Sequence, residues 1–440
     1  MKTRKIFLLF FATMLMLVVK TSGQIQTPVL MGYVNNWNAG TNPYVQLTDV
    51  PKQYGMIAMA FSIPRPGTDY DTTFVSDGVA KDTLIRQIKT VQNQGRRVLI
   101  SVGGATAPIS LDNLMERDTF ISSITRIINT YGFDGIDIDF EGNSILVSKG
   151  TTIANPTDVK IINLIAAIKQ IMVNFRATHG RKMILTMAPE MSHFPGGISG
   201  YGNNWGAYLP IIDALRDSLD LVHTQLYNGG SMNGLDGRTY YQATGDFIVA
   251  MTELCIRGFN TTGGYFKGLP ANKIAVGLPA CPSAAGSGFM DTATVAAAMR
   301  YLLGKGPKVG TYTLLQAGGY PTLGGMMTWS INWDKVTTCN NSEYEFMKNY
   351  ERIFSNTTPT TIAEVPSYSF KIYPNPSNGV FTIESDKQVS IEIYDLNGKV
   401  LKAISNQTST KIDVSDFSKG MYFLRMNDGI SIQTEKIIIR

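Results

Sequence analysis

Three carboxylic acids stand at alternate positions of one short segment. The sequence Phe133-Asp-Gly-Ile-Asp-Ile-Asp-Phe-Glu141 places Asp137, Asp139 and Glu141 two residues apart. Strand side chains alternate between two faces, so the acids share one face and the apolar residues share the other. Acids that point together into a protein interior must be protonated, hydrogen-bonded or metal-bound, and their repulsion raises at least one pKa. The pattern therefore predicts a carboxylic acid that stays protonated and serves as a general acid.

A calcium site and a solvated acidic loop are the alternatives for this segment. Calcium takes six to eight oxygens, usually from a loop that wraps the ion, whereas a strand presents its acids in a row. The three histidines (His179, His193, His223) lack metal-ligand spacing, and we expect each to be an ordinary surface or core residue. The sequence has no Gly-x-Ser-x-Gly motif for a serine hydrolase. We expect no metal and no cofactor.

These three acids (Asp137, Asp139 and Glu141), called the acid row below, stand in a chain that alternates regularly between strand-like and helix-like segments. Helical periodicity is expected over 81–93, 118–130, 158–176 and 293–303, and in the third of these it predicts core-facing Ile161, Ile162, Ile165, Ile168 and Ile171. Eight such repeats predict an α/β fold, a (β/α)8 TIM barrel; a doubly wound sheet would need a phosphate-binding loop, which is missing. The predicted strands are 29–34, 56–61, 97–102, 135–140, 183–187, 219–226, 274–278 and 325–329.

In such a barrel the chemistry lies at the carboxyl ends of the strands. The third predicted strand ends in Ser101-Val-Gly-Gly104, and the sixth ends in Gln225-Leu-Tyr-Asn228. The eighth ends at Trp329, and the fifth runs through Met187 toward Glu190. These segments are expected to surround the acid row.

The acid row and the glycine pair resemble the glycoside hydrolase family 18 chitinases. The family pattern Asp-Gly-x-Asp-x-Asp-x-Glu is met by residues 134–141, and Ser-x-Gly-Gly by residues 101–104, over a resemblance that covers about 28–350. The resemblance implies substrate-assisted, retaining hydrolysis of β-1,4-linked N-acetylglucosamine. It makes Glu141 the acid and base, Asp139 the residue that orients the substrate acetamide, and Asp137 the residue that holds Asp139.

The same resemblance assigns further residues around the cleft. Tyr227 matches the tyrosine that contacts the acetamide, while Gln225 and Asn228 depart from the commoner Met-x-Tyr-Asp pattern and look like a bacterial branch. Because Asn228 does not ionise, one contributor to the family's pH profile is missing. Trp329 matches the floor under the sugar at the cleavage point. The other expected substrate-binding residues are Tyr33, Trp37, Met187, Gly103 and Gly104, with Trp205 and Glu190 as weaker candidates for the cleft wall.

Both ends of the chain read as targeting segments. Residues 1–23 combine a basic start, an apolar run and small residues, which is typical of a secretory signal peptide. Residues 24–355 are the expected catalytic domain, and the Thr/Pro-rich stretch 356–369 is a predicted linker. Residues 370–440 alternate short strands with turns, which predicts a small all-β sandwich; a carbohydrate-binding module is the alternative.

The sandwich resembles the C-terminal sorting domain of the type IX secretion system. The matching segments begin at Tyr373-Pro-Asn-Pro, Ile393-Tyr-Asp-Leu and Gly420-Met-Tyr-Phe. The resemblance implies an extracellular or cell-surface protein whose partner is the type IX machinery. Three cysteines (Cys255, Cys281, Cys339) allow one disulfide, and the sequence does not choose the pair.

The net charge of +5 is concentrated outside the catalytic domain. Of 39 basic and 34 acidic residues, four and none lie in 1–23 and nine and eight in 366–440, which leaves 26 of each sign. The neutral balance removes the argument for a nucleic-acid partner. We expect a monomer that acts on chitin or another N-acetylglucosamine glycan, with short strand connections that favour endo cleavage.

Three other functions are considered. An endo-β-N-acetylglucosaminidase that cuts N-glycan cores would use the same acids. A sugar-binding protein on this barrel typically lacks the acid at Glu141, and its presence argues against that class. An adhesin with the barrel as a scaffold is opposed by the complete acid row.

Overall fold

The computed structural model describes residues 25–355, 370–395, 399–427 and 432–440. The chain divides into two compact units after Ser355. The predicted signal peptide 1–23 and the predicted linker 356–369 lie outside the described residues.

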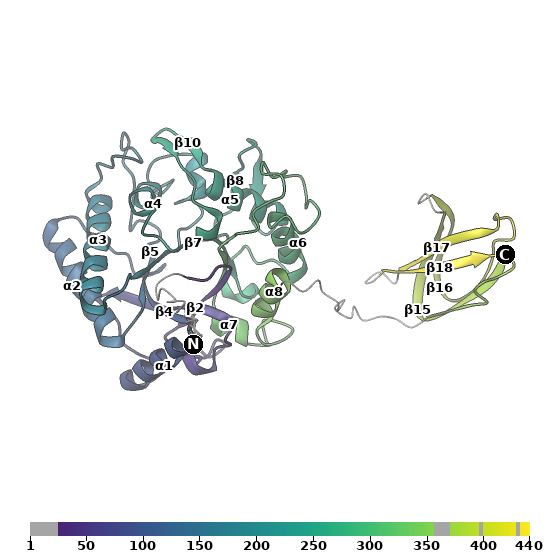
Figure 1. The fold of residues 1–440 in the computed structure, drawn as a ribbon, viewed down its shortest axis with the longest axis horizontal. Helices are drawn as coiled ribbons and strands as arrows, with labels where there is room; N and C mark the ends of the chain where they lie inside the picture. Colours follow the sequence, from purple (N-terminus) through teal and green to yellow (C-terminus); the bar gives the residue numbers. More distant parts are fainter. Residues whose placement is uncertain (1–24, 356–369, 396–398, 428–431) are drawn as a thin grey trace, which may run out of the picture. The chain divides into compact units, whose positions relative to one another are not determined.

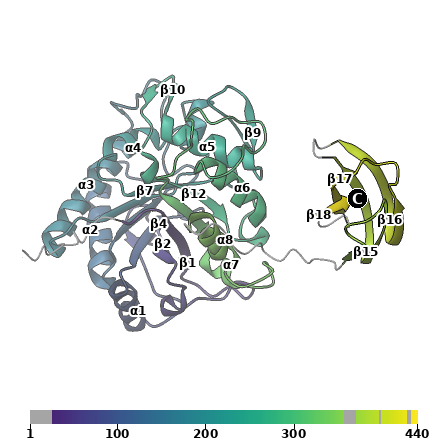
Figure 2. The same ribbon diagram turned by 45° about the vertical axis from the view of Figure 1, so that its right-hand side comes forward.

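The first unit is a closed barrel of eight parallel strands (Figures 1 and 2). The strand order is β1-β13-β12-β7-β6-β5-β4-β2, and pairing of β1 with β2 closes the ring. All eight predicted strands are present, so the predicted fold class is confirmed. They are β1 (Val29–Asn35), β2 (Tyr54–Pro64), β4 (Arg97–Gly103), β5 (Gly135–Asp139), β6 (Ile184–Met187), β7 (Leu221–Gln225), β12 (Ile274–Pro279) and β13 (Gly325–Trp329).

Helices surround the barrel, and their ends follow local sequence signals. Asn113 accepts a hydrogen bond from the backbone N–H of Glu116 at the start of α2, and Gly132, with φ of +77°, ends that helix. Thr244 and Asp291 cap α5 and α6 in the same way. The helices are α1 (Lys81–Asn93), α2 (Leu114–Tyr131), α3 (Val159–His179), α4 (Leu209–Leu215), α5 (Gly245–Arg257), α6 (Thr292–Leu302), α7 (Ile331–Lys335) and α8 (Glu345–Phe354).

Short strands and 3-10 turns lie in the loops that connect the barrel strands and helices. They are β3 (Thr72–Thr73), β8 (Ser231–Asn233), β9 (Thr239–Tyr241), β10 (Phe259–Thr261), β11 (Gly264–Phe266) and the 3-10 turns η1 (Leu47–Asp49), η2 (Pro195–Ile198), η3 (Ala271–Lys273) and η4 (Pro282–Ala284). Between β12 and β13 the chain forms only η4, α6 and loops. Within the described residues, no helix has the length and apolar character to cross a membrane.

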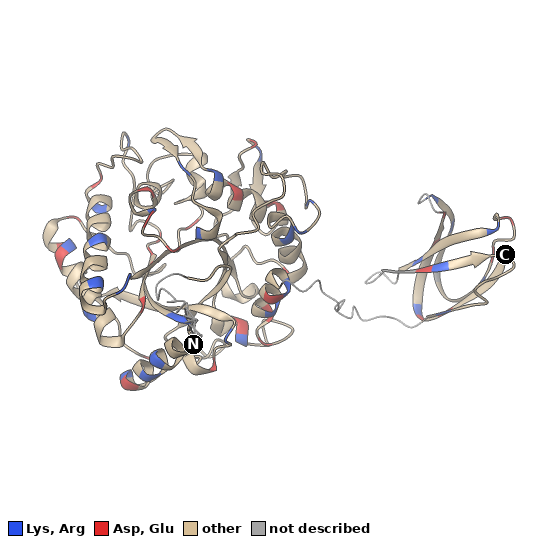
Figure 3. Ribbon diagram, viewed as in Figure 1, with Lys and Arg blue, Asp and Glu red and all other residues tan. Residues whose placement is uncertain are grey.

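Strand alternation divides the barrel core into two layers. One cluster fills the space between strands and helices and includes Ile136, Ile138 and Phe140. A smaller cluster, with Tyr33 as one member, lies inside the ring. In α3, the expectation for Ile162 is wrong: the side chain is 44% exposed, because one residue after Ile161 the helix has turned by about 100°. Lys, Arg, Asp and Glu are frequent on the surrounding helices (Figure 3).

One disulfide joins two loops of the first unit. Cys281, just after β12, is bonded to Cys339, which follows α7. Cys255 in α5 is a free, buried thiol. Burial raises the pKa of this thiol to about 12, so it is protonated and inert at neutral pH.

The second unit is a five-stranded antiparallel β-structure with its own apolar core. Its strand path is β14-β15-β17-β18, and β16 pairs with β15. The alternating side chains Phe381, Ile391, Leu424 and Ile437 are buried. The predicted all-β class of this unit is confirmed. Its strands are β14 (Phe370–Tyr373), β15 (Val380–Tyr394), β16 (Val400–Asp413), β17 (Gly420–Asn427) and β18 (Ile432–Ile439).

Candidate active site

The three acids of the row lie at the carboxyl end of β5. Asp137 is 0% exposed and Asp139 is 3% exposed, and both face the interior of the barrel. Glu141 lies two residues beyond the last residue of the strand and is partly exposed. The loop after Glu141 is fastened by Glu190, whose Oε2 accepts a hydrogen bond from the backbone N–H of Gly142 at 2.7 Å. Solvent exposure therefore increases along the row, from the buried Asp137 to the partly exposed Glu141.

Asp137 is surrounded by hydrogen-bond donors from four other strands. Its Oδ2 accepts from the hydroxyls of Tyr33 at 2.6 Å and Ser101 at 2.8 Å. Its Oδ1 accepts from the hydroxyl of Thr186 at 2.6 Å and lies 2.9 Å from Nε2 of His223. Burial alone would raise the pKa of Asp137, but the charge of His223 and these hydrogen bonds outweigh it and lower the pKa. Asp137 is thus ionised.

Asp139 and Glu141 behave in the opposite way. Burial, together with the charges of Glu141 and Asp137, raises the pKa of Asp139 well above its usual value. Burial also raises the pKa of Glu141, although hydrogen bonds with Gln225 and Asp139 oppose that shift. The two groups share a hydrogen bond, and both pKa values are raised, that of Asp139 more strongly than that of Glu141.

Gln225, at the end of β7, connects these two acids. Its Nε2 lies 2.9 Å from Oδ1 of Asp139 and 3.2 Å from Oε1 of Glu141. The same nitrogen is 3.0 Å from the backbone carbonyl of Ala188, which orients the amide. Gln225 was expected to contact substrate; it also lines the cleft, and its amide positions both carboxyl groups.

The acids open into a cleft of about 560 Å³. Its aromatic part is formed by Trp329, whose ring is stacked on Phe61 at 5.7 Å and meets Tyr33 edge-on at 5.4 Å. Trp37 extends this surface, with its ring 6.4 Å from Phe61. The predicted residues that line the cleft are Tyr33, Trp37, Gly103, Asp139, Glu141, Gln225, Tyr227, Asn228 and Trp329.

Tyr227 and Asn228 form the wall beside Glu141. Tyr227 is 7% exposed, and burial with the nearby acids raises the pKa of its phenol well above 10, so the hydroxyl is protonated. Asn228 has a left-handed backbone with φ of +56°. Its Oδ1 accepts a hydrogen bond from the backbone N–H of Ser287 at 3.0 Å, which holds the amide at the mouth of the cleft.

The two predicted glycines have a steric function beside Asp139. Gly103 has φ of +111°, and a Cβ added there would lie 2.5 Å from the backbone oxygen of Asp139. Gly104 has φ of +89° and donates its N–H to that same oxygen at 2.8 Å. A Cβ at Gly104 would touch the ring of Phe61 at 2.9 Å. Gly103 lines the cleft, whereas Gly104, which was also expected to bind substrate, is not among the lining residues and contacts the backbone of Asp139 instead.

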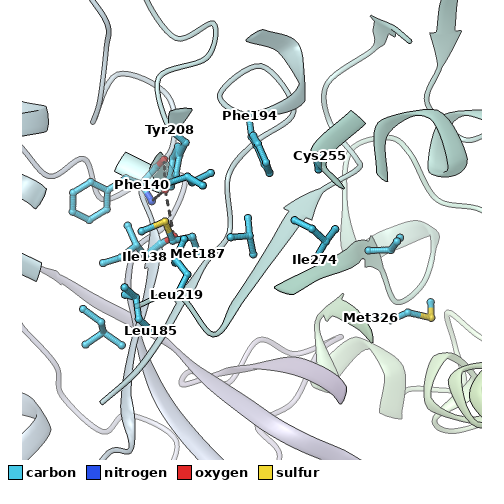
Figure 4. Close-up of a cluster of buried hydrophobic side chains, with 14 of the residues drawn as sticks. Ile138, Phe140, Leu185, Met187, Phe194, Tyr208, Leu219, Cys255, Ile274 and Met326 are labelled. Carbon is cyan, nitrogen blue, oxygen red and sulfur yellow. Dashed lines mark hydrogen bonds between the residues drawn. The ribbon is translucent and has the colours of Figure 1, made fainter. Parts of the chain in front are cut away.

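Met187 does not belong to the site. Strand alternation turns Thr186 and Ala188 toward the interior, so Met187 points outward among the side chains that face the helices (Figure 4). The expectation that Met187 binds substrate is therefore wrong. Trp205 is 36% exposed, lies against Gly196 and does not line the cleft.

Sequence reasoning missed four residues that build the site. His223 and Thr186 contact Asp137, and Phe61 supports Trp329. The hydroxyl of Tyr208 accepts a hydrogen bond from the backbone N–H of Phe140 at 2.8 Å and thereby holds the end of β5. Alternation offered a signal for His223, because it stands two residues before Gln225 on the same face of β7. Among the described residues, no group of His, Cys, Asp and Glu is arranged to hold a metal.

Comparison with known proteins assigns families to both units. Residues 29–364 match the model of glycosyl hydrolases family 18, and residues 371–440 match a secretion system C-terminal sorting domain. The chain is 42% identical to chitinase Chi52 of Paenibacillus xylanexedens over 319 residues, which are 72% of this chain and 60% of that protein. It is 33% identical to chitinase ChiA of Flavobacterium johnsoniae over 435 residues, 92% of this chain and 27% of that protein.

A solved structure shows the same barrel. The family GH18 chitinase from Chromobacterium violaceum is 33% identical and superimposes with a TM-score of 0.65, over 74% of this chain and 83% of that one. The chain therefore spans about three fifths of its first curated relative and about a quarter of the Flavobacterium protein.

We predict that Gly103→Ala destabilises the barrel and displaces Asp139. The added methyl group meets the Asp139 carbonyl in a backbone conformation that favours glycine, which should lower the free energy of unfolding by about 1–3 kcal/mol. Denaturation of the full chain followed by tryptophan fluorescence measures this, because all four tryptophans precede residue 356. Gly40→Ala is the control, since a Cβ there meets nothing within 4 Å. Equal stability of the two variants would contradict the prediction.

Proposed function

The chain belongs to glycosyl hydrolase family 18, and we propose that it is a chitinase that cleaves β-1,4-linked N-acetylglucosamine polymers with retention of configuration. The observation that carries this proposal is the graded row of acids: an ionised Asp137, a protonated Asp139 and an accessible Glu141 beside an aromatic floor. The chitinases among its relatives support the same substrate class.

Glu141 is the proposed general acid, because its raised pKa keeps a proton available and it faces the cleft. It donates this proton to the glycosidic oxygen as the bond to the anomeric carbon breaks. The carbonyl oxygen of the substrate's 2-acetamido group attacks the same carbon from the other face and forms an oxazolinium ion. Glu141, now a carboxylate, then takes a proton from the water that opens this ring, and the enzyme returns to its first state.

Asp139 and Tyr227 are proposed to hold the acetamide during these steps. Asp139 orients the amide nitrogen, and the protonated Tyr227 hydroxyl donates to the carbonyl oxygen. The ionised Asp137 below them offsets the positive charge of the oxazolinium ion. Trp329 is proposed to provide the apolar surface for the sugar ring, and Trp37 and Asn228 also line the cleft.

The open cleft favours endo cleavage. Strands β12 and β13 are joined by η4, α6 and loops alone, so no inserted domain raises a wall over the cleft there. An endo-β-N-acetylglucosaminidase remains the second candidate, since it needs the same acetamide chemistry. The chitinases among the relatives favour the first.

We further propose that the protein is secreted. The chain carries a secretion system sorting domain, and we assign it to the type IX pathway, with residues 1–23 as the signal peptide. The segment 356–369 is proposed as the linker to the catalytic domain of residues 24–355. The enzyme is proposed to act as a monomer.

Glu141→Gln should abolish most turnover without unfolding the chain. The amide is nearly isosteric but has no acidic proton to transfer to the leaving group, and loss of general acid catalysis costs about 10²- to 10⁴-fold in rate. The rate on a chromogenic N-acetylglucosamine dimer, with circular dichroism as the folding check, tests this. Glu343→Gln, at an exposed position, is the matched control. A Glu141→Gln enzyme with near-normal turnover would refute the assigned acid.

Gln225→Leu should move the alkaline limb of the pH–rate profile to higher pH. The Gln225 hydrogen bond lowers the pKa of Glu141, so its removal raises that pKa. An acid that must be protonated then stays active to higher pH, although the whole profile falls because the acids lose a common support. The measurement is kcat/KM against pH, with Gln170→Leu on the outer surface of α3 as control. An alkaline limb that stays in place or moves to lower pH contradicts this role.

The substrate is tested by offering chitin oligomers and a high-mannose glycoprotein to the full chain. We expect dimers of N-acetylglucosamine from the oligomers, with longer fragments appearing first from polymeric chitin because cleavage is internal. Release of the glycan without cleavage of chitin would support the second candidate instead. Dimers as the sole early product would refute endo action.

A further inference from the structure

His223 lies at the base of the acid row, and the mechanism above does not involve it. Both His223 and Asp137 have fully buried side chains, and 2.9 Å separate Nε2 from Oδ1. The imidazole meets the ring of Tyr33 edge-on, with 6.0 Å between ring centres and 72° between planes. This contact and the hydrogen bond to Asp137 fix the orientation of the ring.

We propose that His223 is a positioning residue that completes a closed shell of four donors around Asp137 and so confines the exchangeable proton of the site to Asp139 and Glu141. The inference rests on the proposed function, because it concerns the acids of that reaction. It assigns a role to a residue that neither contacts the cleft nor reacts.

The shell follows from the number of acceptor positions on a carboxylate. Two oxygens offer about four lone-pair positions. Tyr33 and Ser101 occupy those of Oδ2, and Thr186 and His223 occupy those of Oδ1. A proton on Asp137 would have to displace one of these donors. Asp137 is therefore unable to take the proton of Asp139.

The proton of Asp139 then has one acceptor in reach. The amide of Gln225 donates to Oδ1 of Asp139, so the proton belongs on Oδ2, and the hydrogen bond that Asp139 makes runs to Glu141. When Glu141 gives its own proton to the leaving group, this bond stabilises the new carboxylate. The incoming water later returns a proton to Glu141, and Asp137 keeps its charge throughout.

The surroundings of His223 contain few other titratable groups. Asp137 on β5 and Tyr33 on β1 contact its ring. Asp139 stands two residues after Asp137 on β5, nearer to the carboxyl end of the strand. The neighbouring strands β6 and β12 present Thr186 and Ala275, which do not titrate. Among the described residues, Asp137 is therefore the acid that a change at His223 affects first.

The test compares His223→Leu with His223→Gln in the full chain. Leucine removes the donor, so kcat/KM should fall by roughly 10- to 100-fold. In His223→Leu, the acidic limb of the profile of kcat/KM against pH should move to higher pH by about one unit, because Asp137 takes up a proton more readily. Glutamine places a nitrogen where Nε2 lies, so it restores the donor but not the charge of His223; it should recover part of the activity and shift the acidic limb less than leucine does. His179→Leu, on α3 and away from the cleft, is the control.

Two outcomes of these variants would overturn the proposal. They are a His223→Leu profile that superimposes on the wild-type profile, and a His223→Gln enzyme as impaired as His223→Leu, which would show that the hydrogen-bond donor at Nε2 is not the cause. Nitrogen-15 spectra of the wild-type imidazoles give a test that needs neither activity nor a folded variant. We expect a proton on Nε2 of His223, and a ring protonated on Nδ1 alone would refute the shell. A wild-type chain without chitinase activity would refute the proposed function and leave this measurement valid.

Discussion

The site depends on keeping one carboxylate ionised in the dry interior of a barrel. An isolated charge there costs several kcal/mol. Asp137 avoids that cost because Tyr33, Ser101, Thr186 and His223 approach it from β1, β4, β6 and β7. A closed ring of strands is what brings four separate segments of chain around one side chain. The closed barrel is therefore required to keep Asp137 ionised, because it brings the four donors together.

The charge of Asp137 organises the acids above it. Burial raises the pKa of Asp139 well above its usual value, and the charges of Glu141 and Asp137 add to that shift. Asp139 consequently holds a proton that it shares with Glu141. The backbone beneath is equally constrained, since Gly104 donates its N–H to the carbonyl of Asp139 and Gly103 leaves room for that oxygen. Asp139 is thus constrained in two ways: its surroundings raise the pKa of its side chain, and the two glycines fit closely against its backbone carbonyl.

The parts of the site that strand alternation determines could be predicted from the sequence, and the parts that depend on neighbours could not. The acid row is predictable because acids at alternate positions of one strand share a face, and the apolar residues between them require that face to point into the barrel. Met187 stands near the end of its strand, but its side chain lies on the face opposite to Thr186 and Ala188, so nearness to the strand end does not place it in the cleft. Strand alternation places His223 on the inner face of β7 but does not reveal its contact with Asp137, and the contact of Phe61 with Trp329 likewise depends on a neighbouring strand. The eight strands were predictable, since each is a short apolar run between turn residues.

The amide of Gln225, at the end of β7, links two close acids through a neutral hydrogen-bond donor. Gln225 reaches both Asp139 and Glu141 through one nitrogen, and the carbonyl of Ala188 holds that nitrogen in place. An aspartate in this position would add repulsion to a pair whose pKa values are already raised, and a methionine would leave both oxygens without a donor. A neutral donor instead favours the ionised form of Glu141 in part, so its acidity is moderated. Neither Gln225 nor Asn228 titrates, so the acid row itself carries the exchangeable protons of the cleft, and the nearby charge of Glu190 helps to raise the pKa values of Asp139 and Glu141.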